Sequence, residues 1–137
     1  MPFGDSLGEF VLKATSVRTV PLGGELVRIE VDFVGDVKGQ VTGRHFGTLL
    51  SYPTDPKRPY TWTYAGRTLA DSGAIIRTTS EGTAVRTGNG HKIRFRGAQR
   101  FITDDPQLAD FNHLIGAIEA EADPMTMTLT GVACVWR

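Results

Sequence analysis

Apolar and polar residues alternate with a period of two along most of this chain. From Val27 to Phe33 every second residue is apolar, and Arg, Glu and Asp stand between them. Because successive side chains of a β-strand point to opposite faces, this segment is predicted to be a strand with one dry and one solvent face. The same alternation predicts strands over 10–17, 41–50, 60–65, 67–70, 74–79, 84–87, 91–103, 114–122 and 126–136.

Turn-forming residues separate these segments. Gly66 is expected to end one strand and Ser80–Gly82 to connect two others. The triplet Gly88–Gly90 predicts a tight hairpin, since glycine and asparagine tolerate left-handed backbone conformations. Asp105 followed by Pro106 has the pattern of an N-cap and a first helical residue, which predicts one short helical turn.

Regular short strands with turns between them are typical of a sandwich or a barrel. Long strands with one wet face leave no natural sheet edge, and only closure removes edges altogether, which favours the barrel. We therefore expect an all-β fold: a single antiparallel β-barrel domain over residues 1–137, with about eight to ten strands and one short helical turn near residues 105–111.

Composition narrows the partners. The chain has 15 basic and 15 acidic residues, and this balance argues against binding to nucleic acid or to an anionic membrane surface. A net charge of zero leaves little repulsion between copies, so a homo-oligomer is possible. No apolar run is long enough for a membrane helix, and no secretory signal is recognisable. With Cys134 as the single cysteine, a reduced cytoplasmic protein is expected.

The segment Arg96–Asn112, the glutamates at 119 and 121, and the terminal Val135-Trp136 carry a resemblance. Over this last third the chain resembles uncharacterised bacterial small β-barrel proteins of lipocalin-like or allene-oxide-cyclase-like shape. The resemblance implies a barrel fold and no catalytic residues, because the shared segment is a strand, a capped turn and a return strand. Barrels of this shape include both ligand carriers and cyclases or isomerases.

Two residues are candidates for acid–base chemistry. His45 lies on the face of its strand that is expected to point inward, where it could transfer protons or simply be a hydrogen-bonded core residue. Glu119 would have a raised pKa if it pointed inward. The simpler interpretation places Glu119 and Glu121 in solvent, opposite Arg94 and Arg96 on the neighbouring strand.

A second group of candidates would line an interior site. The alternating aromatics could shape a pocket or only fill the barrel. Gln99 is the one polar residue on an otherwise apolar strand face, so it is either structural or a ligand contact. The candidate ligand-binding residues are Tyr60, Trp62, Tyr64, Phe95, Gln99 and Phe101.

Other chemistry has little support. The basic residues at 92, 94, 96 and 100 are expected to form a solvated strand face that pairs with acidic neighbours. The three histidines show no metal-binding spacing, so neither a metal nor a cofactor is predicted.

Three functions follow from this pattern. The first is binding of a small, mostly apolar metabolite inside the barrel. The second is a cofactor-independent cyclase, isomerase or lyase that uses His45 or Glu119 as acid or base. The third is a structural or assembly role for a filled barrel. The first two need a cavity of a few hundred cubic ångströms, on the order of known small-molecule sites, and a packed interior would leave the third.

Overall fold

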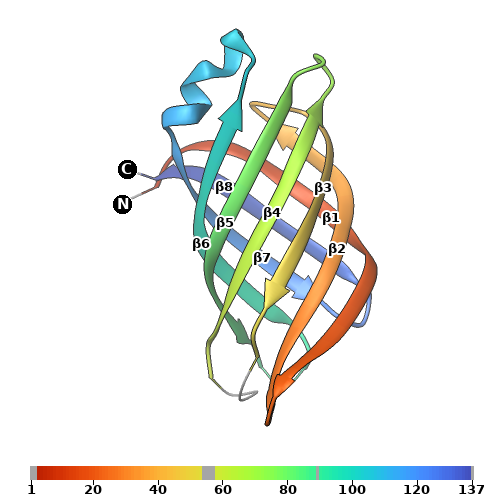
Figure 1. Cartoon of the computed structure of the whole chain (residues 1–137). Coiled ribbons are helices and arrows are strands. Elements are labelled where there is room, and N and C mark those ends of the chain that lie inside the picture. The colour runs from red at the N-terminus through yellow and green to blue at the C-terminus, as the bar shows by residue number, and fades with distance from the viewer. Residues whose placement is uncertain (1–2, 54–57, 89, 137) are drawn as a thin grey trace.

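Eight antiparallel strands form one closed barrel in which each strand pairs with its neighbours in the chain (Figure 1). The structure is a computed structural model that describes residues 3–53, 58–88 and 90–136. The elements are β1 (Phe3–Gly23), β2 (Leu26–Gly39), β3 (Gly43–Ser51), β4 (Tyr60–Ala70), β5 (Ile75–Arg86), β6 (Ile93–Thr103), the 3-10 helix η1 (Pro106–His113), β7 (Ile115–Asp123) and β8 (Thr128–Trp136).

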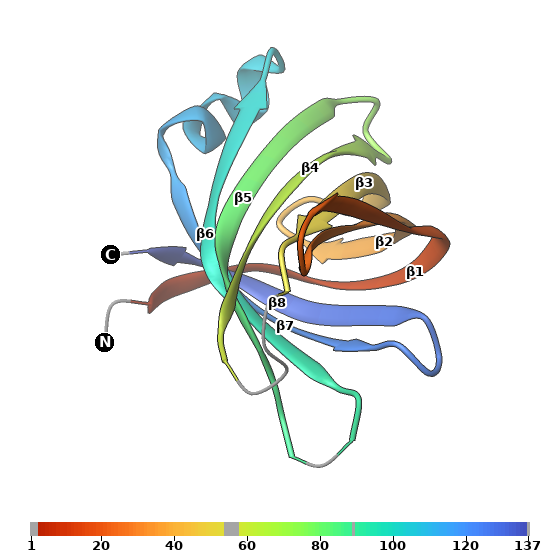
Figure 2. The same cartoon turned by 60° about the horizontal axis from the view of Figure 1, so that its bottom comes forward.

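Pairing of the first strand with the last closes the barrel. The β1–β8 register runs from Phe3 opposite Trp136 to Lys13 opposite Thr128. The two ends of the chain therefore lie side by side, as Figures 1 and 2 show. Closure satisfies the backbone hydrogen bonds of both terminal strands and leaves the barrel wall without an open edge.

The predicted barrel is confirmed, with eight strands rather than ten. Gly66 does not end a strand: it lies inside β4, opposite Gly47 and Thr78. The expected turn at 80–82 is also wrong, because Gly82 lies inside β5 opposite Gly97. These glycines make room for large inward side chains, since a Cβ at 47 would meet the Tyr64 phenol. Of the predicted hairpin, Gly88 has φ +62°, and Asn89 lies outside the described residues.

The predicted helical turn is confirmed as η1, which lies at one end of the barrel (Figure 1). The Asp105 carboxylate accepts a hydrogen bond from the Gln107 backbone N–H at 2.8 Å, as an N-cap does. The Asn112 side chain accepts from the Thr103 N–H at 2.8 Å and donates to its carbonyl at 3.0 Å. These bonds hold η1 against the end of β6.

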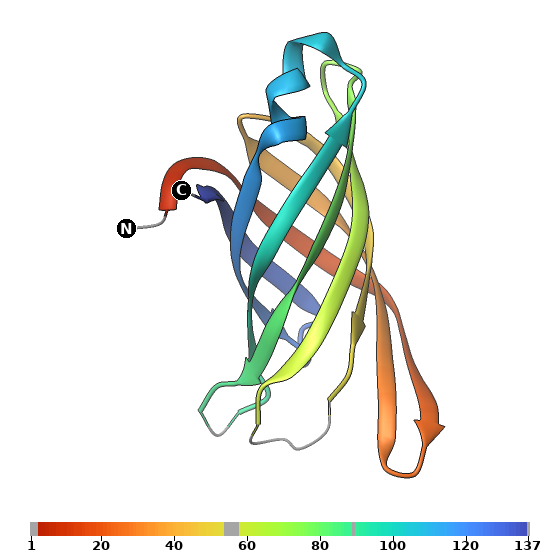
Figure 3. The same cartoon turned by 60° about the vertical axis from the view of Figure 1, so that its left-hand side comes forward.

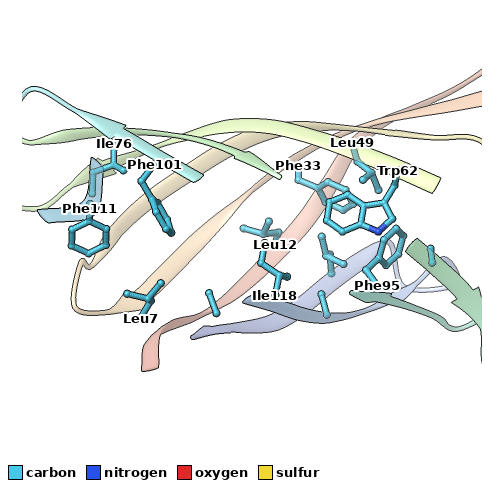
Figure 4. Close-up of a cluster of buried hydrophobic side chains, with 14 residues drawn as sticks. Leu7, Leu12, Phe33, Leu49, Trp62, Ile76, Phe95, Phe101, Phe111 and Ile118 are labelled. Carbon is cyan, nitrogen blue, oxygen red and sulfur yellow. The ribbon is translucent and has the colours of Figure 1, made fainter. Parts of the chain in front are cut away.

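The core fills the inside of the barrel in two aromatic clusters. Phe111 from η1 packs edge-to-face on Phe101, with ring centroids 5.4 Å apart. At the other end Trp62 packs edge-to-face on Phe95 at 5.7 Å. Figure 4 shows Leu12 and Ile118 between these clusters, from opposite parts of the wall. Each cluster closes one end of the interior.

The β1–β2 hairpin continues beyond the barrel as an arm over residues 15–28 (Figure 3). In this arm each strand pairs only with the other, because the β8 partners of β1 stop at Lys13 and the β3 partners of β2 begin at Ile29. One face carries ion pairs from Glu30 to Arg18 at 3.1 Å and to Arg28 at 2.8 Å. Apolar residues lie on the other face.

Candidate functional site

Polar side chains gather on one part of the inner wall. Strand alternation turns every second residue inward, and the register places Tyr64 of β4, Ser80 of β5 and Gln99 of β6 directly opposite one another in a row. His45 of β3 lies opposite Thr68 of β4. The inward polar residues of β3 to β6 are His45, Tyr64, Thr68, Thr78, Ser80 and Gln99.

The opposite part of the wall is apolar. Leu12, Ile118 and Leu129 project from β1, β7 and β8 and face the polar side chains across a cavity of about 110 Å³. This cavity is smaller than the few hundred cubic ångströms expected for a small-molecule site, because the aromatic clusters described above fill both ends. The space that remains has one polar and one apolar side.

His45 is held by two hydroxyl groups. Its Nδ1 lies 2.9 Å from Thr68 Oγ1 and its Nε2 lies 2.8 Å from the Tyr64 hydroxyl. Burial lowers the pKa of the His45 imidazole to about 4, so the ring is neutral at neutral pH. Burial also raises the pKa of the Tyr64 phenol, which keeps its proton. The three groups therefore form an uncharged chain.

This chain contains a spare proton. A neutral imidazole has one N–H, and the hydroxyls of Tyr64 and Thr68 each have one O–H, which makes three donors for two hydrogen bonds. If Nδ1 carries the proton, the Thr68 hydroxyl keeps a donor; if Nε2 carries it, the Tyr64 hydroxyl does. In either tautomer one hydroxyl has a proton that this chain does not use.

Two further polar atoms have no partner. Thr78 Oγ1 and Gln99 Oε1 are buried and form no hydrogen bond within the described part of the chain. Leaving such an atom unpaired costs about 1–3 kcal/mol, so native interiors rarely keep one without a functional reason. Both side chains belong to the cavity wall.

Five of the six predicted ligand-binding residues come together at the cavity. Trp62, Tyr64, Phe95, Gln99 and Phe101 all line it. Tyr60 does not; it is half-buried and packs against the core beside the opening of β4.

The two predicted acid–base residues lie on opposite sides of the barrel wall. His45 lines the cavity. Glu119 points outward, its side chain is 54% exposed, and it pairs with Arg96 at 2.9 Å. The solvent interpretation of Glu119 and Glu121 is therefore confirmed, since Glu121 pairs with Lys92 at 3.5 Å on the same outer face. Glu119 has no access to the interior.

Thr68, Thr78 and Ser80 are cavity residues that the sequence analysis missed. Their signal was present: Thr68 has the same phase as Trp62 and Tyr64 in β4. The expected strand break at Gly66 interrupted that phase. The predicted turn at 80–82 likewise removed Ser80 from any strand face.

The outer surface and the metal question are quickly described. Within residues 3–53, 58–88 and 90–136 no group of three or more His, Cys, Asp and Glu side chains is placed to hold a metal ion. In the same part of the chain, no helix combines the length and the apolar character that crossing a membrane requires.

Solved structures with the same fold exist, and their functions are unknown. A Rhodopseudomonas palustris protein of unknown function is 18% identical over 96% of this chain and 95% of its own, with a TM-score of 0.80. A Clostridium acetobutylicum protein of unknown function is 14% identical over 100% of both chains, with a TM-score of 0.83. A β-barrel-like protein from Acinetobacter baumannii is 14% identical over 97% of this chain and 94% of its own, also at 0.83.

These identities establish a shared fold and nothing more. No protein-family model matches the sequence, and no curated protein matches it. The function must therefore be argued from the cavity.

Proposed function

We propose that this barrel binds a small, mostly apolar molecule in its interior. The observation that carries the proposal is the cavity of about 110 Å³, with Leu12 and Ile118 on its apolar side and unpaired polar atoms on the other. An apolar cavity of ~150 Å³ is large enough to hold benzene. The ligand is therefore limited to about six non-hydrogen atoms, a single small ring or a short branched chain.

The ligand is expected to be neutral. No Asp, Glu, Lys or Arg among the described residues lines the cavity, and His45 is uncharged at neutral pH. An ion inside would have no countercharge, and burying an unpaired charge is far more costly than burying a neutral group.

Binding is measurable through Trp62, which lines the cavity. Trp136 is the only other tryptophan, so the Trp136→Phe variant reports from Trp62 alone. Methylcyclopentane, with six non-hydrogen atoms, is expected to change this fluorescence saturably and to raise the melting temperature. Ala133→Leu, which fills the cavity, should abolish both effects, whereas Ala98→Leu on the exposed face should preserve them. Equal responses of the two variants, or none in the parent protein, would overturn the proposal.

Binding is favoured over cofactor-independent cyclase, isomerase or lyase activity. Both nitrogens of His45 are occupied, and Glu119 lies outside the barrel. A general base must reach the proton that it removes, and no described carboxylate lines this cavity. The lipocalin-like or allene-oxide-cyclase-like shape inferred from the sequence stays a prediction.

A second candidate function, self-assembly, is supported by the arm of β1 and β2. A two-stranded ribbon is marginally stable in water on its own. Val17 and Leu26 on this arm are 49% and 54% exposed. We infer that a second copy of the chain covers them. Sedimentation velocity should show a dimer that Val17→Ser and Leu26→Ser together dissociate; a monomer at all concentrations would contradict this.

A further inference from the structure

The unpaired polar atoms of the cavity wall lie on two neighbouring strands. Ser80 of β5 is directly opposite Gln99 of β6, and Thr78 lies two residues before Ser80 on the same inner face. On the outer flanks of this pair the register places Gly66 of β4 opposite Thr78 and Gly116 of β7 opposite Gln99. Because glycine has no side chain, nothing from either flanking position covers the group. We refer to Thr78, Ser80 and Gln99 as the polar patch.

The polar patch is deeply buried. Thr78 is 5% exposed and Ser80 is 7% exposed. Thr78 Oγ1 and Gln99 Oε1 form no hydrogen bond with any described residue. A hydroxyl can donate or accept, whereas an amide oxygen only accepts. The patch therefore offers a donor and an acceptor close together.

The chemistry of the missing partner follows from these two atoms. A ketone or ether oxygen would accept from Thr78 and leave Gln99 Oε1 unpaired. A carboxylate would bring a charge to a wall on which no described residue is Lys or Arg. A hydroxyl group both donates and accepts, so it satisfies both atoms at once.

We propose that the molecule bound in the barrel is a small neutral alcohol whose hydroxyl is held by Thr78 and Gln99, with its hydrocarbon part against Leu12 and Ile118. This inference rests on the proposed binding function and adds the chemical class of the ligand. The hydroxyl donates to Gln99 Oε1 and accepts from the Thr78 hydroxyl. The geometry of the cavity supports the division, because the polar patch and the apolar wall belong to opposite parts of the barrel.

Cyclopentanol and methylcyclopentane are a matched pair for the test, since each has six non-hydrogen atoms and only the alcohol has an oxygen. The two compounds differ in hydration, so the informative quantity is the ratio of their dissociation constants in each protein variant. Thr78→Val keeps the shape of the side chain and removes its hydroxyl. Gln99→Met keeps its length and removes the amide. Thr79→Val, the same change one residue along on the exposed face, is the control.

In the wild-type protein cyclopentanol is expected to bind at least as tightly as methylcyclopentane. Thr78→Val and Gln99→Met should each weaken cyclopentanol tenfold or more relative to methylcyclopentane, while Thr79→Val leaves the ratio unchanged. Methylcyclopentane binding without cyclopentanol binding, or a ratio that no variant alters, overturns the alcohol assignment and leaves the proposed function intact. Binding of neither compound overturns both.

Discussion

Protonation of His45 is expected to destabilise the barrel in mild acid. The folded protein holds this imidazole between Thr68 and Tyr64, where burial lowers its pKa to about 4 from an ordinary 6.5. Above pH 6.5 the ring is neutral in both the folded and the unfolded chain and has no effect. Between pH 6.5 and 4 the unfolded chain takes up a proton that the folded protein does not. The free energy of unfolding therefore falls as the pH falls through this range.

The size of the effect follows from the two pKa values. Each pH unit between them is worth about 1.36 kcal/mol. At pH 4.5 the loss attributable to His45 is therefore between about 2 and 3 kcal/mol. A domain of this size has ~5–15 kcal/mol of stability in total, so the loss is a substantial fraction.

Urea denaturation at pH 7.5 and pH 4.5 measures this loss. Wild-type protein should lose about 2–3 kcal/mol more between these pH values than the His45→Gln variant, which cannot titrate at this position. The exposed His113→Gln variant should behave like wild type. Hydrogen bonds from Ser16, Thr48 and Arg18 lower the pKa of Asp32, and its protonation also destabilises the fold, but equally in all three proteins. Equal pH dependence of wild type and His45→Gln would refute the reasoning.

Four other substitutions test the interior. Tyr64→Phe leaves His45 Nε2 unpaired and should cost about 1–3 kcal/mol, read from urea denaturation. Gly47→Ala places a methyl group on the Tyr64 phenol and should lower the melting temperature strongly; a change of less than ~1 kcal/mol in unfolding would contradict this packing. Phe111→Ala should cost about 3–5 kcal/mol and speed hydrogen exchange in η1. Thr78→Val removes an unpaired hydroxyl and should stabilise the ligand-free protein by about 1 kcal/mol, as calorimetry can show.

The sequence was sufficient for the architecture of the fold. Alternation over residues 27–33 and 91–103 defines an inner and an outer face, and both faces are as predicted in β2 and β6. The number of strands was not predictable in the same way, because Gly66 and Gly82 look like turn residues along the chain. Their roles depend on the large side chains of neighbouring strands, which only the register brings next to them.

The candidate site was predicted in part for the same reason. Gln99 and Tyr64 could be recognised from the apolar or aromatic residues around them in their own strands. The pairing of His45 with Thr68 and Tyr64 could not, because it joins β3 to β4 through a register that the sequence alone does not determine. The volume of the cavity depends on how the aromatic rings pack at its two ends, and alternation contains no information about that.

The β1–β8 pairing also constrains when the protein can fold. The two strands that close the barrel are separated by nearly the whole length of the chain, and their contacts are among the longest-range in the molecule. Contacts of this kind form late and slow the folding reaction. During synthesis β1 has to wait, paired only with β2, until β8 has left the ribosome. A nascent chain that is stalled before β8 thus exposes the free edge of β1, where a chaperone, or a strand of another nascent chain, could bind.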